Sequence, residues 1–353
     1  MTTGDRCGGQ VSRRLVSRRR ALGAALAWPL ACTLLGFSRQ TAAQALDDGP
    51  TGTLAVPRGS DLVLIEADGG GERVLLTLAA GAFVSDAAWS PDGQRIACTR
   101  YMGQPGQGPA RSALLVVGLE PGDGPPVVLV PPDPAGMMLA EPAWAPDGSG
   151  LAFQSIGLPA GRPPVLRIEW VAADGSGRRT LVEDGRGPTF SPDGTTIAYV
   201  KLGSRGEELW VRSTAGGAGR QVIADEGLMA LTTPRFSPNG GQIAFAGVGD
   251  VGGSGMRPDS IKGALDGEPG AYRSLAAGPR LHGPPWDPFL VDLSGADLRR
   301  LTLLGEDEAA VAWSPDGRWI AVSGVGGLHF VSVPGASVRT LSIVATYGGI
   351  DWR

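Results

Sequence analysis

Cysteine and histidine are scarce in this sequence. Its 353 residues include three cysteines and two histidines. Cys7 and Cys32 lie in the first 45 residues, so without that segment Cys98 stands alone and no intramolecular disulfide can form. We expect Cys98 to be a small buried apolar residue on a strand. With only His282 and His329, a zinc or manganese site built from several imidazoles is excluded.

Recognisable catalytic patterns are also missing. No nucleophile has a local histidine and acid partner in the sequence. His329 falls in the apolar run 327–330, where we expect it to be packed or hydrogen-bonded rather than reactive. Acid–base chemistry by two carboxylates brought together from distant segments stays open. Helix signals are nearly absent too, since no apolar run beyond residue 45 keeps a 3.6-residue period.

The sequence instead contains a short repeated motif, called the phrase below, which occurs five times. An aromatic residue is followed by Ser or Ala, then Pro, Asp or Asn, and Gly. Successive aromatic residues are 55, 46, 46 and 77 positions apart. A unit of about 40 to 45 residues with four short strands is typical of a β-propeller blade. The five copies are Trp89-Ser90-Pro91-Asp92-Gly93, Trp144-Ala145-Pro146-Asp147-Gly148, Phe190-Ser191-Pro192-Asp193-Gly194, Phe236-Ser237-Pro238-Asn239-Gly240 and Trp313-Ser314-Pro315-Asp316-Gly317.

The phrase predicts a strand, a tight turn and a second strand. Proline fixes the first corner, Asp accepts local amide protons, and Gly takes positive φ. A third strand and often an outer fourth strand follow, so each unit has four antiparallel strands, named a to d. The predicted third strands are 114–119, 166–171, 208–212, 289–293 and 328–333, and 178–182 is an example of an outer strand.

The two ends of the sequence predict closure into a ring. Residues 54–57, 62–66 and 73–77 read as strands b, c and d of a unit that lacks strand a. Residues 349–353, which include Trp352, read as a strand a without the rest of its unit. Joining them completes one blade and removes the exposed sheet edges. The predicted fold class is therefore all-β, a six-bladed propeller of four-stranded antiparallel blades that occupies residues 46–353.

The phrase resembles the TolB-type (PD-type) β-propeller repeat, which also occurs beside the hydrolase domain of prolyl oligopeptidase-like enzymes. The resemblance covers nearly all of the chain after residue 45 and implies a stand-alone propeller. The α/β domain that precedes the TolB propeller is not recognised. Neither is the Gly-x-Ser-x-Gly elbow of the peptidases, because 252–255 is a Gly-rich loop rather than a strand-to-helix turn. The resemblance implies a fold and transfers no function.

Residues 1–45 are predicted to be an export signal. The basic segment 17–20 precedes an apolar stretch at 21–37, and Ala43-Gln44-Ala45 is a small-x-small cleavage site. The paired arginines resemble a twin-arginine signal. An ordinary Sec signal and an uncleaved anchor helix are the alternatives. We therefore expect a periplasmic or extracellular protein, in contact with a membrane only through an uncleaved leader.

Charge narrows the class of partner. The first 45 residues carry seven arginines and one aspartate, so the net charge of -4 becomes about -10 without them. An acidic body disfavours nucleic acid and anionic membrane surfaces as partners. We expect a monomer that has no cofactor and binds a protein or peptide in the cell envelope.

Loop length indicates which face of the ring carries function. The a–b and c–d turns are short and share one face, and we expect the a–b turns to be structural. The b–c loops and the d-to-a crossings share the other face and include a long insertion at 248–285. Loops displayed on a rigid scaffold often carry function, so the insertion is predicted to be a partner-contacting arm or, alternatively, a passive insertion. The candidate binding residues are Arg257, Asp259, Tyr272, Arg280 and His282 of the insertion, and Trp286 directly after it.

Two acidic residues are further candidates on the same face. Asp86 and Glu141 each stand three residues before the aromatic residue of their phrase, in neighbouring blades. Both are predicted to approach the axis of the ring, where they are candidates for binding a ligand or a cation such as Ca²⁺. The alternative interpretation is that they are solvated loop carboxylates.

Two functions follow from these observations. The preferred hypothesis is an exported, non-catalytic binding or scaffold protein that holds a protein or peptide on the loop-rich face. The alternative is an extracytoplasmic hydrolase or lyase that acts on carbohydrate or peptide through carboxylates.

Overall fold

The computed structural model describes residues 49–102, 111–120, 122–159, 161–204, 206–223, 228–249, 285–333, 335, 337–342 and 348–353. The predicted export signal lies outside these residues. Gly49–Arg353 is one compact unit. No helix in the described ranges is long and apolar enough to cross a membrane.

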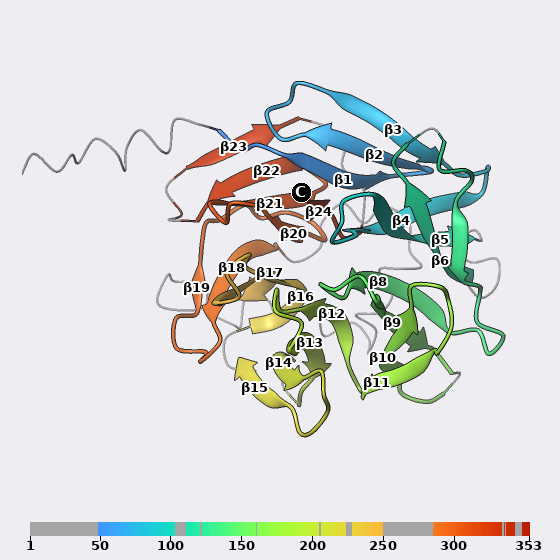
Figure 1. Ribbon diagram of the computed structural model, residues 1–353. Helices are drawn as coiled ribbons and strands as arrows, with labels where there is room; N and C mark the ends of the chain where they lie inside the picture. The colour runs from blue at the N-terminus through green and yellow to red at the C-terminus, as the bar shows by residue number, and fades with distance from the viewer. Residues whose placement is uncertain are drawn as a thin grey trace, which may run out of the picture. The chain divides into compact units, whose positions relative to one another are not determined.

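The described residues form six four-stranded antiparallel sheets arranged as the blades of a propeller (Figure 1). The predicted fold class and number of blades are confirmed. Blade 1 consists of β24 (Asp351–Trp352), β1 (Thr53–Arg58), β2 (Asp61–Glu66) and β3 (Glu72–Thr77), and blade 2 of β4 (Ala82–Trp89), β5 (Arg95–Met102), β6 (Arg111–Gly118) and β7 (Val127–Val130).

The other four blades follow in chain order. Blade 3 contains β8 (Met138–Trp144), β9 (Gly150–Gly157), β10 (Val165–Ala172) and β11 (Arg179–Glu183). Blade 4 contains β12 (Arg186–Phe190), β13 (Thr196–Leu202), β14 (Glu207–Ser213) and β15 (Arg220–Ile223). Blade 5 contains β16 (Leu228–Phe236), β17 (Gln242–Gly249), β18 (Asp287–Asp292) and β19 (Arg299–Arg300). Blade 6 contains β20 (Ala310–Trp313), β21 (Trp319–Gly324), β22 (Gly327–Ser332) and β23 (Val338–Leu341).

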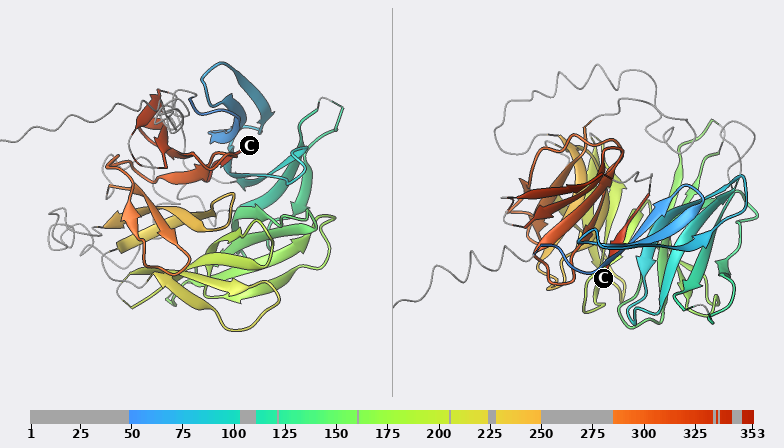
Figure 2. Two further views of the ribbon diagram at one scale, coloured as in Figure 1. Left: turned by 60° about the vertical axis from the view of Figure 1, so that its left-hand side comes forward. Right: turned by 90° about the horizontal axis from the view of Figure 1, so that it is seen from above.

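The inner strands are buried on both faces because each blade packs between two neighbours. All residues of β9, β21 and β22 are buried, whereas three of the four residues of the outer strand β23 are exposed. Strands covered on both faces read as continuous apolar runs rather than as alternating patterns. Figure 1 shows β4, β8, β12, β16 and β20 nearest the centre of the ring, and the right-hand view of Figure 2 shows strands running between its two faces.

The core is divided among the contacts between blades. Six hydrophobic clusters each join one pair of adjacent blades around the ring. Between blades 4 and 5, for example, Val200 and Leu209 pack with Phe245 and Phe289. Cys98 lies in the cluster between blades 1 and 2, where burial raises the pKa of its thiol to about 12. The expectation of a small buried apolar residue is confirmed.

The repeated phrase forms the a–b turn through local hydrogen bonds. In blade 2 the Ser90 hydroxyl donates to Asp92 at 2.5 Å and accepts the Arg95 N–H at 3.0 Å. Gly93 has a φ of 69°, in the left-handed region that Gly adopts without strain. Blades 4 and 6 repeat the Ser–Asp bond, and blade 5 has Asn239 in the place of Asp.

The final residues close the ring. Leu54 pairs with Trp352 and Ala55 with Asp351, which confirms the predicted composite blade. The same segment reaches blade 2, where Gly349 O accepts the Ala87 N–H at 2.8 Å. The guanidinium of Arg353 donates to the carbonyls of Ser90 and Pro91 at 3.1 and 2.8 Å.

Arg353 also lies against the turn glycine of blade 2, where other blades have a proline. In blades 4, 5 and 6 the turn glycine faces the turn proline of the preceding blade, as Gly240 faces Pro192. Blade 1 has no such turn before blade 2, and the Arg353 guanidinium lies against Gly93 instead, so close that a side chain at Gly93 would displace it.

Trp352→Ala is expected to lower the free energy of unfolding by about 3–5 kcal/mol, as truncation of a buried aromatic side chain does. Trp352 is 6% exposed, packs edge-on against Phe330 and donates its indole N–H to Thr51 O at 3.0 Å. Urea unfolding measures the loss. The matched control is Trp210→Ala in blade 4. Trp210 is only partly buried, so we expect a clearly smaller loss of unfolding free energy. Equal losses of unfolding free energy in the two variants would contradict a special contribution of the pairing between Trp352 and blade 1.

Candidate binding site on the axis of the ring

Four innermost strands share a β-bulge three residues before their aromatic residue. The pairing register shifts around Asp86, Glu141, Gly187 and Thr233. Their φ angles lie between 48° and 61°, in the left-handed region. A bulge re-aims the side chain of the extra residue and leaves its backbone out of the ladder. The repeated position is therefore turned from the sheet toward neighbouring strands at the centre.

Asp86 uses this position to join three blades. Its Oδ1 accepts the N–H of Gly349 in blade 1 at 2.8 Å, and its Oδ2 accepts the N–H of Glu141 in blade 3 at 3.2 Å. The residue is 6% exposed. Thr233 acts in the same way, because its hydroxyl oxygen accepts the N–H of Val311 in blade 6 at 3.2 Å. Asp86 and Glu141 lie within strands β4 and β8 rather than in loops, and the alternative of a solvated loop carboxylate is wrong for the buried Asp86.

The side chain of Glu141 is partly buried. Its Oε2 is buried with no hydrogen-bond partner in the part of the chain that the structure describes. That oxygen lies 3.0 Å from the place a Cβ would take on Gly187, so the absence of a side chain in blade 4 makes room for it. Burial raises the pKa of Glu141 to about 7, and the Asp86 carboxylate adds to the rise. The guanidinium groups of Arg186 and Arg235 oppose the rise.

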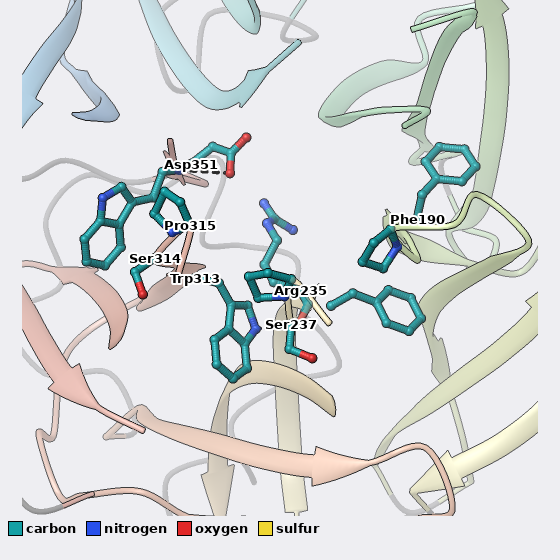
Figure 3. Close-up of a pocket in the computed structure, with 11 residues that line it drawn as sticks. Phe190, Arg235, Ser237, Trp313, Ser314, Pro315 and Asp351 are labelled. Carbon is teal, nitrogen blue, oxygen red and sulfur yellow. Dashed lines mark hydrogen bonds between the residues drawn. The ribbon is translucent and has the colours of Figure 1, made fainter. Parts of the chain in front are cut away.

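A hollow of about 210 Å³ lies on the turn face of the ring (Figure 3). Arg235 and Asp351 are its charged residues, and Figure 3 shows Arg235 between Asp351 and Phe190. Asp351 accepts the backbone N–H groups of Trp89 and Trp352 at 2.7 and 2.9 Å. Burial raises the pKa of Asp351 despite those bonds and the nearby arginine. The remaining walls are Phe190, Pro192, Phe236, Ser237, Pro238, Trp313, Ser314, Pro315 and Trp352.

The sequence interpretation missed this hollow, because it treated the short a–b turns as purely structural. A signal was nevertheless present in the repeat. The residue immediately before the aromatic residue is Ala in blades 2, 3 and 6 and Thr in blade 4, but Arg235 in blade 5 and Asp351 in blade 1. The two departures from a small side chain are the two charges of the hollow.

The predicted binding residues of the insertion are only partly covered by the structure. Arg257, Asp259, Tyr272, Arg280 and His282 lie outside the described residues. Trp286 lies at the start of the described part, where its backbone pairs with Glu306 through two hydrogen bonds of 2.8 and 3.1 Å. Its side chain packs at the edge of the cluster between blades 5 and 6.

A buried pair of titratable groups lies in blade 6. Nε2 of His329 is 2.7 Å from Oε1 of Glu306, and its Nδ1 is 2.9 Å from the Thr340 hydroxyl. The Gly326 N–H donates to the other oxygen of Glu306 at 2.7 Å. His329 is thus packed and hydrogen-bonded, as expected. Across the described ranges, no three His, Cys, Asp or Glu side chains are grouped to hold a metal ion.

Comparison with known proteins finds likeness at the level of the fold. No protein-family model matches the sequence. The chain is 24% identical over 206 residues to the uncharacterized peptidase YuxL of Bacillus subtilis (strain 168), which is 52% of this chain. The matched stretch is 29% of YuxL, so the chain spans less than a third of that protein's length.

Solved structures are similar over most of the chain. TolB from Acinetobacter baumannii has a TM-score of 0.62 and 17% identity, with 88% of this chain and 69% of that chain covered. The fold is that of a TolB-like six-bladed β-propeller. The putative TolB from Agrobacterium tumefaciens has a TM-score of 0.56 and 15% identity, with 85% and 91% covered. At these identities the likeness concerns the TolB-like fold alone.

Glu141→Gln is expected to flatten the pH dependence of stability. The folded propeller holds the Glu141 proton up to about pH 7, whereas the ordinary pKa is 4.5. Folding therefore takes up a proton between these values, and stability falls as pH rises through that window. At pH 8 the variant should be more stable than the wild type by roughly 1–3 kcal/mol, and near pH 4 by little.

Urea unfolding from pH 4 to pH 8 measures this difference. The charged groups around Glu141 are Asp86, Arg186, Glu207 and Arg235, and none is changed. A smaller slope of the same sign should remain in the variant, because the pKa of Asp351 is also raised. Glu120→Gln at an exposed surface position is the control. If both variants keep the wild-type slope, Glu141 is not the group that takes up the proton.

Proposed function

We propose that this TolB-like propeller is an exported, non-catalytic binding protein that holds a protein or peptide partner in the cell envelope on its loop-rich face. The observation that carries the proposal is the distribution of exposed apolar side chains. Apolar residues at protein–protein contacts are buried on binding and supply much of the driving force.

Ten large apolar residues are exposed in the described part of the chain. Four of them lie on the outer strands β3, β7 and β23. The other six lie where strand b meets strand c or where strand d crosses to strand a, so they belong to the loop-rich face. These six come from five different blades and are Phe83, Leu158, Val165, Leu202, Leu303 and Val325. No a–b or c–d turn contributes to the ten.

This asymmetry favours the loop-rich face over the rim as the partner-binding surface. Isolated exposed apolar residues are ordinary, and it is their uneven distribution between the two faces that supports the proposal. The described ends of β17 and β18, between which the long insertion runs, lie at that face as well.

The rival function is a carboxylate-based hydrolase or lyase, and the distant likeness to YuxL bears on it. Asp86 and Glu141 are neighbours on the axis, and a carboxyl group that titrates near neutral pH suits acid–base chemistry. Both oxygens of Asp86 accept backbone N–H groups from adjacent blades, however, which supports a structural role. Turnover of a glycan or peptide panel that is abolished in Glu141→Gln would favour the enzyme.

A paired substitution tests the binding face. Leu202→Asp with Leu303→Asp changes two residues of the loop-rich face that are 60% and 70% exposed. Val127→Asp with Val128→Asp is the matched control on the outer strand β7, at 61% and 45% exposure. Partner retention from envelope extract, quantified for each variant, should fall at least about tenfold in the first and remain near wild type in the second.

Folding must be equal in the two variants for this comparison, which circular dichroism and thermal unfolding establish. Equal retention by both variants, or a loss confined to the β7 variant, would overturn the assignment of the loop-rich face.

A further inference from the structure

Arg235 presents an unpaired guanidinium to the hollow on the turn face. Its one hydrogen bond in the described residues is from Nη1 to the carbonyl of Pro234 at 3.0 Å, and no carboxylate there lies within ion-pair distance. Arg186, which precedes it by one blade, pairs with Glu207. An arginine fork has five N–H donors and binds carboxylates in a two-point arrangement. Arg235 therefore has donors to offer a ligand.

Most other polar groups of the hollow are already engaged. The hydroxyls of Ser237 and Ser314 bond to Asn239 and Asp316 of their own turns. The indole N–H of Trp313 donates to Arg235 O at 3.0 Å. Asp351 accepts two backbone amides, but a carboxylate has about four lone-pair sites and can accept further bonds. The hollow thus combines one free cation, one carboxylate acceptor and aromatic or proline walls.

We propose that this hollow binds the C-terminal residue of a peptide chain. The terminal carboxylate pairs with the Arg235 fork, the amide N–H of the same residue donates to Asp351, and its apolar side chain packs among Phe236, Trp313 and Trp352. The C-terminal residue of a peptide carries all three of these groups. The site is distinct from the loop-rich face, because it lies at the other ends of the same inner strands.

Size and charge agree with this occupant. The volume of about 210 Å³ is below the roughly 300–1,000 Å³ of drug-sized ligand pockets, so it suits one residue rather than a larger molecule. Glu141 opposes an incoming carboxylate when ionised. Since burial and Asp86 raise its pKa to about 7, that charge is partly absent near neutral pH.

Calorimetric titration of the full chain with two blocked peptides tests the proposal. N-acetyl-glycyl-leucine has a free carboxylate, and N-acetyl-glycyl-leucinamide differs only in lacking it. The acid should bind at least about tenfold more tightly than the amide, as expected for a two-point charged hydrogen bond. N-acetyl-glycyl-glycine should bind more weakly than the leucine acid, because it lacks the apolar side chain.

Variants assign the effect to Arg235. Arg235→Gln should weaken the acid to the level of the amide and leave the amide unchanged. Arg235→Lys should be intermediate, because an ammonium keeps the charge but loses the fork. Arg167→Gln, which removes an exposed arginine paired with Glu183 on blade 3, is the matched control and should bind like the wild type. The loop-face variant of Leu202 and Leu303 should also bind the acid normally.

Three results would each overturn the proposal. They are equal affinity for acid and amide, an unchanged affinity for the acid in a folded Arg235→Gln variant, and no binding of the acid at millimolar concentration. If Arg235→Gln does not fold, the comparison of acid with amide on the wild-type protein still decides.

Discussion

The pairing of residues 349–353 with two different blades is the constraint on which the rest of this propeller depends. A row of separate four-stranded sheets would leave open faces at both ends, and each blade buries its apolar surface only between two neighbours. Ile350 and Trp352 complete the contact between blades 6 and 1, while Gly349 and Arg353 bond to blade 2. One short segment therefore joins three consecutive blades, and it places Asp351 on the axis.

Local chemistry explains why the sequence predicts most of the fold. The Ser–Pro–Asp–Gly turns form through hydrogen bonds within six residues, so each copy marks a hairpin wherever it occurs. The predicted strand 114–119 is observed as β6 (Arg111–Gly118), and the predicted strand 328–333 as β22 (Gly327–Ser332). Closure could be predicted as well, because the end of the chain contains the one strand that its beginning lacks.

The axial site could be predicted only in part, because it depends on contacts between repeats. Asp86 and Glu141 were expected near the axis, but the bulges that bury them depend on the neighbouring inner strands. Arg235 and Asp351 are 116 positions apart in the sequence and meet only after the ring has closed. Comparison between copies of the repeat identifies them, because a charged residue replaces a small one directly before the aromatic residue.

The place of Arg353 against Gly93 has a mechanical consequence. The turn glycines of blades 4, 5 and 6 each face the rigid proline ring in the turn of the preceding blade. At the junction of blades 1 and 2 this role falls to Arg353, a long side chain with several rotatable bonds. The turn face at this junction is therefore held by a side chain that can change rotamer, whereas the proline rings at the other three junctions are rigid.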